Sequence, residues 1–566
     1  MNTDRNLSKH YLFILIGILI VTFIPFLGDT LFNTKGEPRE AIVAMSMLDS
    51  GNWILPESYG NDIPYKPPFL AWCISAVSLV TGGVSEFTSR FPSAIALIVM
   101  ALSLFWFYAR RVSPLKAMAT ALITITSFEV YRAGVACRVD MLLTACIVGA
   151  LLAFYRHWER GCRGLSWWAI ALMNFGVLTK GPVGMLLPCM VIGVFRLMKG
   201  ARFMPTFLSL VASGLLACVL PALWYIAAYN QGGDSFMTLA LEENFGRFFG
   251  NMSYESHENP IHYNFITVIA GLLPYTILLL LSLFVLRYSL PEENGITAQI
   301  KRLWARIRKM DSVNLFSLLS IVLIFVFYCI PKSKRSVYLL PIYPFIAYFI
   351  TLLVVWLIRE RKSMPIKVYG YIIGCIAVIT PIVYVTINFV DFSVGEKVNI
   401  FINGLREYTI GIVGWVMIAL SLMSGLALVA YNHKVKLSRS FCLSITTLLT
   451  IYWSYSYVYQ PAVLNVKSDK IVAEQLQCRF PETPIYTHID AYLMRYYTLN
   501  YYMNDRLRLF DEELPQKGLL LLNETESEVF VAKHDDNYNF LKLHTTSHRS
   551  CDTRDNISVY SFSKED

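Results

Sequence analysis

Long apolar runs separated by short charged clusters set the strongest limit on the fold of this 566-residue chain. Several runs reach the roughly 20 residues that a helix needs to cross the hydrocarbon core of a bilayer. Hydrophobic residues make up 55% of the chain and charged residues only 16%. A soluble domain carries about 25% charged residues, and its helices keep polar faces that these runs lack. The sequence therefore predicts an α-helical polytopic membrane protein.

The clusters of lysine and arginine predict how the helices are oriented, because short cytoplasmic loops carry most of the positive charge. The clusters that this rule places inside include Arg5/Lys9, Arg110/Arg111, Arg156 to Arg163, Lys301 to Lys309 and Arg359 to Lys362. About 13 spans are then expected, with single helices over 115–133, 205–229 and 263–287 and an interfacial or re-entrant piece over 69–81. The net charge of +9 is assigned to these loops. No nucleic-acid-binding motif accompanies it, so no nucleic-acid partner is expected.

The composition divides the chain into two domains. Residues 1–459 are expected to form the transmembrane domain, with outer loops over 29–68 and 230–262. Residues 460–566 lack long apolar runs and are expected to form a small α/β soluble domain on the outer face. Its strands are predicted over 484–487, 507–510, 518–522 and 557–562, with a helix around 490–499.

Two of the eleven cysteines, Cys478 and Cys551, lie in this polar C-terminal domain. Outside the cytoplasm they could form a disulfide. The distance between them cannot be read from the sequence, so a disulfide and two free thiols both stay open.

Charged residues collect at the outer ends of the predicted spans. Ionisable groups at membrane depth are costly, and their presence there indicates function. These residues are Glu37, Arg39, Glu40, Lys66, Arg138, Asp140, Lys180, Glu242, Glu243, Arg247, His257, Lys332, Lys334 and Arg335. Carboxylates next to cations suit a substrate that carries both a sugar and a phosphate. Taken singly, each has a plain structural explanation, such as helix capping or a lysine that reaches the membrane surface.

The outer residues give only weak support to two more specific kinds of site, a nucleotide-triphosphate site and a metal site. Thr179-Lys180-Gly181-Pro182 has a lysine at a tight turn but lacks the preceding glycine-rich run of a nucleotide-triphosphate loop. His257, with Glu255 or Glu258, could ligate a metal ion, but one histidine with loosely spaced carboxylates is a weak metal signal.

Six motifs, taken in order and on one side of the membrane, resemble a known family. They are Lys35–Glu40, Pro64–Pro68, Arg138–Asp140, Thr179–Pro182, Glu242–Phe248 and Pro331–Pro341. The chain resembles bacterial GT-C glycosyltransferases, specifically the relatives of aminoarabinose lipid A transferase and of protein O-mannosyltransferases. The resemblance covers residues 11–345 best, and the remaining residues only in layout.

This resemblance implies roles for the outer charged residues. It implies Glu37 and Asp140 as catalytic carboxylates, and Arg39, Lys66, Lys180, Arg247 and Tyr338 as ligands of the donor phosphate. It adds Glu243, Lys332, Lys334 and Arg335 to the site, and His257 as a candidate metal ligand. The chain departs from the family at Gly36, which replaces an acid, and at Tyr65, which replaces a glutamate before Lys66. The second change removes an expected metal ligand and weakens the case for a metal ion at His257. No metal is required for the expected reaction, because Lys66, Arg39 and Lys180 would take its place at the phosphate, and a divalent ion held by His257 is left open.

The expected activity is transfer of a sugar, with inversion at C1, from polyprenyl (undecaprenyl) monophosphate to a lipid A-like glycolipid. A protein acceptor on the same scaffold is the alternative. A transporter of lipid or sugar is the rival from another class, although its ionisable groups would sit near the middle of the spans. The expected location is the bacterial inner membrane, among membrane lipids, with the site and the C-terminal domain in the periplasm.

Overall fold

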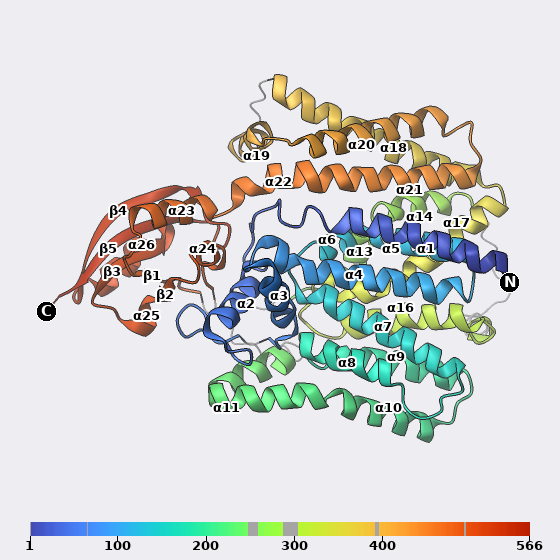
Figure 1. Ribbon diagram of the computed structural model, residues 1–566, viewed down its shortest axis with the longest axis horizontal. Helices are drawn as coiled ribbons and strands as arrows, with labels where there is room; N and C mark the ends of the chain where they lie inside the picture. Colours follow the sequence, from blue (N-terminus) through green and yellow to red (C-terminus); the bar gives the residue numbers. More distant parts are fainter. Residues whose placement is uncertain are drawn as a thin grey trace.

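The apolar runs fold into long helices that lie side by side, and the polar C-terminal residues form a sheet domain at one end of them (Figure 1). The computed structural model describes residues 2–64, 66–246, 258–286, 304–390, 395–491 and 494–565. The N-terminus lies at the end of the helical bundle opposite the sheet domain.

Seven helical segments among the described residues are long and apolar enough to cross a membrane. They are α4 (Glu86–Ala109), α7 (Val139–Glu159), α10 (Phe203–Ala217) with α11 (Val219–Leu241), α16 (Ser312–Cys329), η2 (Ser336–Ile342) with α17 (Tyr343–Arg359), α18 (Ser363–Phe389) and α20 (Ile412–Tyr431). The bent pair α13 (His262–Gly271) and α14 (Tyr275–Leu283) makes an eighth if it is one span. Further helices are α1 (Asn2–Phe23), α2 (Pro38–Ser50), α3 (Phe69–Thr81), α5 (Pro114–Ile125), α6 (Phe128–Gly134), α8 (Trp167–Lys180), α9 (Val183–Met198), α19 (Glu396–Glu407), α21 (Leu437–Ser454) and α22 (Gln460–Leu464). The predicted membrane class is confirmed, and the expected total of about 13 spans stays a prediction.

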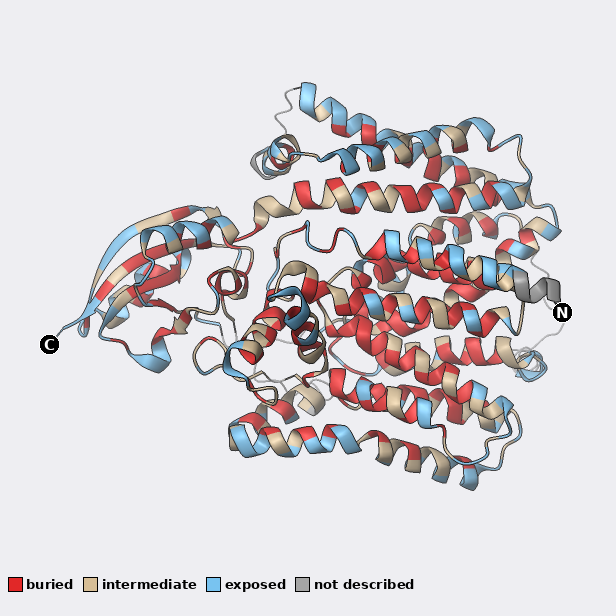
Figure 2. Ribbon diagram, viewed as in Figure 1, coloured by how far each residue is buried: buried red, intermediate tan, exposed pale blue. Residues whose placement is uncertain are grey.

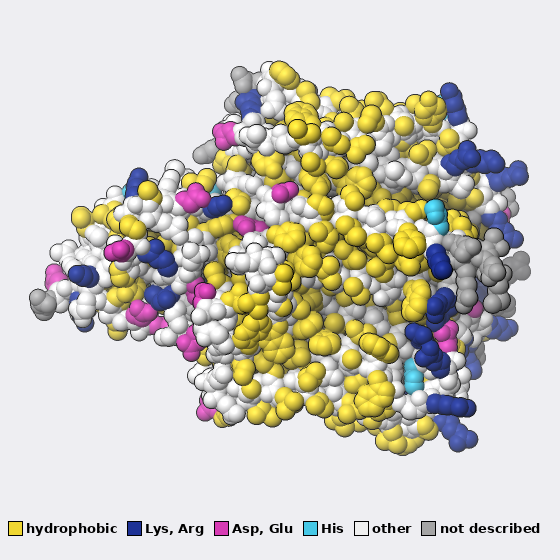
Figure 3. Space-filling model, viewed as in Figure 1, with side chains coloured by type: hydrophobic (Ala, Val, Ile, Leu, Met, Phe, Trp, Pro, Cys, Tyr) yellow, Lys and Arg dark blue, Asp and Glu magenta, His cyan; other side chains and the backbone are white. Residues whose placement is uncertain are grey.

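Helix α7 lies at the centre of the bundle, and α10 and α11 lie at its edge. In the most apolar window of α7, 78% of the residues are buried, against 22% for the window across α10 and α11. Figure 2 shows the same contrast, with buried residues concentrated in the middle of the bundle and exposed residues on the outlying helices. Because the exposed side chains there are largely apolar (Figure 3), these outer helices face lipid.

Two of the single helices predicted from the sequence are broken in the structure. The run over 115–133 divides at Thr126–Ser127 into α5 and α6, where both hydroxyls bond to the carbonyls four residues earlier. Such local bonds weaken the helical ladder and bend it. The run over 263–287 bends by 105° between α13 and α14 at Pro274, which has no backbone N–H to continue a helix.

In the described residues of the C-terminal domain, five strands form a sheet with the order β2-β1-β3-β5-β4. Its elements are α23 (Lys470–Arg479), β1 (Ile485–Thr487), α24 (Tyr497–Tyr502), β2 (Leu507–Leu509), α25 (Phe510–Glu513), β3 (Lys517–Asn523), α26 (Glu524–His534), β4 (Tyr538–Arg549) and β5 (Asn556–Lys564). Strand β1 runs parallel to β2 and β3, while β5 is antiparallel to β3 and β4. The α/β prediction and its four strands are confirmed. The helix predicted around 490–499 begins later, as α24, and β4 was not predicted.

The sheet domain is bonded to the loop that follows α1. The Asn465 side chain accepts from the Leu31 amide at 2.8 Å and donates to the Asp29 carbonyl at 3.1 Å. The Tyr502 hydroxyl accepts from the Phe32 amide at 2.9 Å and donates to Glu86 at 2.7 Å. The first outer loop is therefore held between the helical bundle and the last hundred residues.

Candidate active site

Glu37 is anchored by Arg90, a residue of α4 that faces the loop after α1. The arginine makes a two-point ion pair with the buried carboxylate, at 2.9 Å and 3.1 Å. The Cys137 amide donates to the same carboxylate at 2.8 Å. Burial raises the pKa of Glu37, but the Arg90 charge and these hydrogen bonds outweigh it and leave the pKa below its ordinary value. The same guanidinium donates to the carbonyls of Leu27 and Thr30, so this ion pair fixes the loop that leads into α2.

Glu40, one turn further along α2, binds Lys66 and Arg39. Its carboxylate accepts a hydrogen bond from the Lys66 ammonium and lies 3.3 Å from the Arg39 guanidinium. Burial raises the pKa of Glu40, and the two cations outweigh it, so the pKa is lowered. For Lys66, burial and the repulsion from Arg39 outweigh the attraction to Glu40 and lower the pKa to about 8. A small pocket between α2, α3 and α11 opens beside this pair and is lined by Met47, Pro68 and Trp224, among others.

Asp140 and Lys180 form the third ion pair of the site. Asp140 lies in the first turn of α7, is buried, and accepts a hydrogen bond from the Lys180 ammonium at 2.5 Å. That ammonium also lies 4.2 Å from the centre of the Tyr338 ring. The Tyr338 hydroxyl is buried and has no hydrogen-bond partner among the described residues. A cation and a free phenolic donor therefore meet beside a carboxylate.

The turn after Lys180 depends on a glycine. Gly181 has φ +78°, and a Cβ there would lie 2.0 Å from the Asn244 amide oxygen. Asn244 belongs to the short π-helix η1 (Glu242–Gly246). Glu243 lies in the same helix, and its carboxylate attracts the Lys66 ammonium electrostatically. The segment after α11 is thus packed directly against the lysine turn.

The cations of the loop before η2 are not equally placed. Lys334 is buried, and its ammonium donates to the Pro331 carbonyl at 2.5 Å, whereas Lys332 is exposed. Arg335 occupies the N-cap position of η2, and its charge repels that of Lys35 in the first outer loop. Of the predicted site residues, Arg247 and His257 lie outside the described residues, so their predicted roles are left as they stand.

Sequence reasoning did not include Arg90 or Glu40 in the site. Arg90 had a detectable signal, because an arginine at the start of an apolar span requires a partner. Its partner Glu37 lies 53 residues away, and no spacing rule joins them. Glu40 was recognised as an outer charged residue, but only the packing of the helices shows that it forms an ion pair with Lys66.

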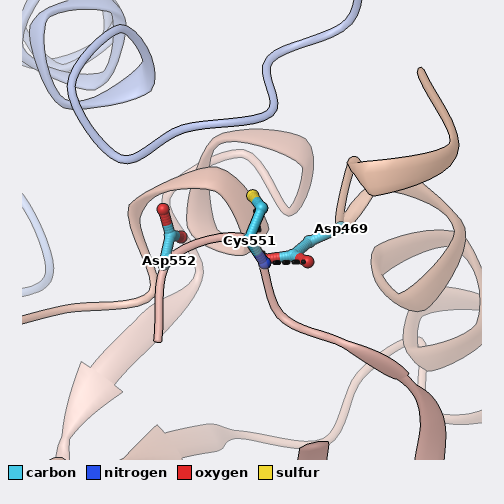
Figure 4. A group of neighbouring side chains, drawn as sticks. All are labelled: Asp469, Cys551 and Asp552. Atoms are coloured by element: carbon cyan, nitrogen blue, oxygen red, sulfur yellow. Dashed lines mark hydrogen bonds between the residues drawn. The ribbon is translucent and has the colours of Figure 1, made fainter. Parts of the chain in front are cut away.

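A second cluster of titratable groups lies in the sheet domain, where Asp469, Cys551 and Asp552 lie close together (Figure 4). The Asp469 side chain accepts from the Cys551 amide at 3.0 Å and from the Ser550 hydroxyl at 2.8 Å. Asp552 accepts from the backbone amide and hydroxyl of Thr498 at 2.6 Å and 2.9 Å. Cys478 and Cys551 are both free thiols.

The pH dependence of the stability of the sheet domain should reveal this cluster. Burial and the neighbouring Asp469 raise the pKa of Asp552 to about 8. The folded protein therefore holds a proton that the unfolded chain releases above its ordinary pKa of 3.8, so stability falls as the pH rises between these two values. Asp552→Asn is expected to remove this loss and to stabilise the domain at pH 8 by at least about 1 kcal/mol, measured as a higher Tm. Equal Tm differences between variant and wild type at pH 5 and pH 8 would contradict this assignment.

Comparison with known proteins gives a consistent set of relatives. A family model described as dolichyl-phosphate-mannose-protein mannosyltransferase matches residues 65–225. An undecaprenyl phosphate-α-4-amino-4-deoxy-L-arabinose arabinosyl transferase of Aeromonas hydrophila is 26% identical over 367 residues, which cover 62% of this chain and 61% of that protein. A protein of Aquifex aeolicus is 28% identical over 346 residues, covering 60% and 63%. The matched segments thus span less than two thirds of these relatives.

The fold has a solved counterpart over nearly its whole length. The crystal structure of ArnT from Cupriavidus metallidurans bound to undecaprenyl phosphate superposes with a TM-score of 0.67 and 15% sequence identity. The match covers 98% of each chain. At this identity the likeness shows the fold.

The helical bundle and the sheet domain together share the fold of that solved ArnT structure, and this is the GT-C-type fold expected from the sequence. Within that class, the chain resembles the undecaprenyl phosphate aminoarabinose transferases, in agreement with the motifs found in the sequence.

Proposed function

We propose that the protein is an inverting glycosyltransferase that moves a sugar from a polyprenyl (undecaprenyl) monophosphate donor to a lipid A-like glycolipid. The observation that carries this proposal is the convergence of Lys66, Lys180 and Arg39 with the carboxylates Glu40 and Asp140 at the sheet-domain end of the bundle. The likeness to a fold solved with undecaprenyl phosphate supports the donor.

In this reaction the cations stabilise the departing phosphate. The bond between sugar C1 and the phosphate oxygen breaks, and its electron pair leaves with the polyprenyl phosphate. Charge that develops on the phosphate is stabilised by fixed cations in a site with little water. Lys66, Arg39 and Lys180 supply this charge, with the free Tyr338 hydroxyl as a further donor. No step of the proposed reaction uses a metal ion.

Asp140 is the proposed general base for a hydroxyl acceptor. The acceptor oxygen bonds to C1 as its proton passes to a carboxylate. Both oxygens of Glu37 are bonded to Arg90, which suits an anchor better than a base. A proton on Asp140 would weaken its hold on Lys180 and direct that ammonium to the leaving phosphate. A phosphate acceptor is already anionic and needs no base.

The proposed location is the bacterial inner membrane, with the site and the sheet domain in the periplasm. Figure 3 shows lysine and arginine side chains gathered at the end of the bundle opposite the sheet domain. Short loops rich in these residues stay in the cytoplasm. The sheet-domain end, where the site lies, is then the periplasmic end.

A transfer assay tests the function and the acceptor together. Membranes containing the protein would receive undecaprenyl phosphate carrying a radiolabelled sugar, from a panel of sugars, together with cell-envelope acceptors. Label in a lipid A-like glycolipid is the expected result, and membranes without the protein give the background.

Label in protein would support the protein O-glycosyltransferase alternative, which the mannosyltransferase family model favours over residues 65–225. If no donor gave transfer and lipid or sugar moved across the bilayer instead, the protein would be a transporter and not an enzyme.

A further inference from the structure

Arg138 holds its guanidinium against Gly36, between two carboxylates of the site. Arg138 occupies the N-cap position of α7, two residues before Asp140, and its side chain makes no capping hydrogen bond. A Cβ on Gly36 would lie 3.2 Å from the Arg138 Nη2 atom and 3.5 Å from its Cζ atom. The guanidinium therefore occupies the space that a side chain at position 36 would need, whereas the backbone at Gly36 does not have a positive φ that would itself favour glycine.

The charge of Arg138 is not neutralised by a bonded carboxylate in the part of the chain that the structure describes. Its electrostatic neighbours are Glu37 and Asp140. Each of these already has its own cation, because Glu37 pairs with Arg90 and Asp140 pairs with Lys180. Within the described ranges, the Arg138 side chain makes no hydrogen bond or ion pair, although the residue is only partly exposed. Its guanidinium donors are therefore available to the anion of a bound ligand.

The chemistry of this group selects phosphate as the ligand. A guanidinium presents several N–H donors in a planar fork that matches two oxygens of a phosphate. Gly36 contributes no side chain that could compete for those donors. A carboxylate at position 36 would neutralise the guanidinium and repel a phosphate.

We infer that Arg138 is a further phosphate-binding residue of this site and that it holds a phosphate group of a substrate beside Gly36. This inference rests on the proposed function. The phosphate has two sources, the polyprenyl phosphate donor and a phosphate carried by the glycolipid acceptor. The two sources share the same chemistry, and separate binding measurements distinguish them.

The test compares Arg138→Gln with the wild-type protein in detergent. Binding of undecaprenyl phosphate is measured without acceptor, and binding of lipid A is measured before and after phosphatase treatment. The variant is expected to lose at least about tenfold in affinity for one phosphate ligand, as loss of a charge-assisted hydrogen bond predicts. Weaker undecaprenyl phosphate binding assigns Arg138 to the donor. Weaker binding of lipid A, but not of its phosphatase-treated form, assigns it to the acceptor.

Two further variants keep the test independent of misfolding. Gly36→Asp places a carboxylate beside the guanidinium while Arg138 stays in place. This variant is expected to lower the affinity for the same phosphate ligand. Arg508→Gln is the matched control, because Arg508 also lies against a glycine, Gly60, but donates to carbonyls of its own strand region. This control is expected to bind both ligands as the wild type does.

Unchanged affinity of Arg138→Gln and Gly36→Asp for both ligands would overturn the inference. Failure of the proposed function looks different, because the wild type itself would then move no label into the lipid A-like glycolipid, whatever the affinities of the variants.

Discussion

Replacing Lys66 with methionine is expected to lower sugar transfer by about 100-fold or more while the protein stays folded. Removing one fixed donor for the developing charge costs a factor of this size in other enzymes. Methionine keeps the length of the lysine stem against the pocket beside Glu40, so the loss reports the ammonium. The measurement is the initial rate of label transfer at saturating donor.

Charge and pH provide the controls for Lys66. Lys66→Arg keeps a cation and is expected to retain most of the donor affinity. With a pKa of about 8, the wild-type ammonium is charged below this pH and loses its charge above it, while the donor phosphodiester keeps its charge. Donor affinity of the wild type should therefore fall between pH 7 and pH 9, and that of Lys66→Arg should not. Lys517→Met, an exposed change in β3, should act as the wild type. Full transfer by Lys66→Met would eliminate the phosphate-clamp role.

Breaking the Arg90–Glu37 pair is expected to have the largest effect on stability. Arg90→Met leaves the buried Glu37 carboxylate without its two-point partner. Removing one partner of a buried ion pair costs about 3–5 kcal/mol, which should appear as a large drop in Tm in detergent. Transfer should also fall, because the loop that leads into α2 loses the bonds to Leu27 and Thr30.

The double variant Arg90→Met/Glu37→Leu separates charge from position. Replacing both ions by apolar groups is often close to neutral for stability, so Tm should recover most of its loss while transfer stays low. The matched control is Arg111→Met, which breaks the more exposed pair with Glu159 and should cost about 1 kcal/mol or less. If Arg90→Met had the same Tm as the wild type, the Arg90–Glu37 pair would not hold the loop that leads into α2.

Much of the fold follows from local sequence patterns. Long apolar runs and the sides of the basic clusters are enough to place Lys66, Asp140 and Lys180 at one end of the bundle. The strands β1, β2, β3 and β5 are short apolar runs between turns, and each could be predicted. Strand β4 (Tyr538–Arg549) could not, because many of its residues are polar or charged and exposed, so it carries little of the alternation that marks a strand.

The pairings within the site could not be predicted, because each depends on how distant helices pack. Lys66 and Glu40 are 26 residues apart, Asp140 and Lys180 are 40 apart, and no helical or strand period joins such positions. The contact between Arg138 and Gly36 has the same origin. The sequence shows only a missing side chain at Gly36, and the bundle shows that a guanidinium fills the space.

The bonds between the first outer loop and the sheet domain have a consequence for how the protein is made. Asn465 and Tyr502 are translated 434 and 470 residues after Leu31 and Phe32, the residues that they hold. During synthesis, α1 and its loop enter the membrane long before these partners exist. A chain released early would insert its helices but leave this loop without its last anchors. The donor lipid would then meet the fully anchored loop only on a chain that had been translated past Tyr502.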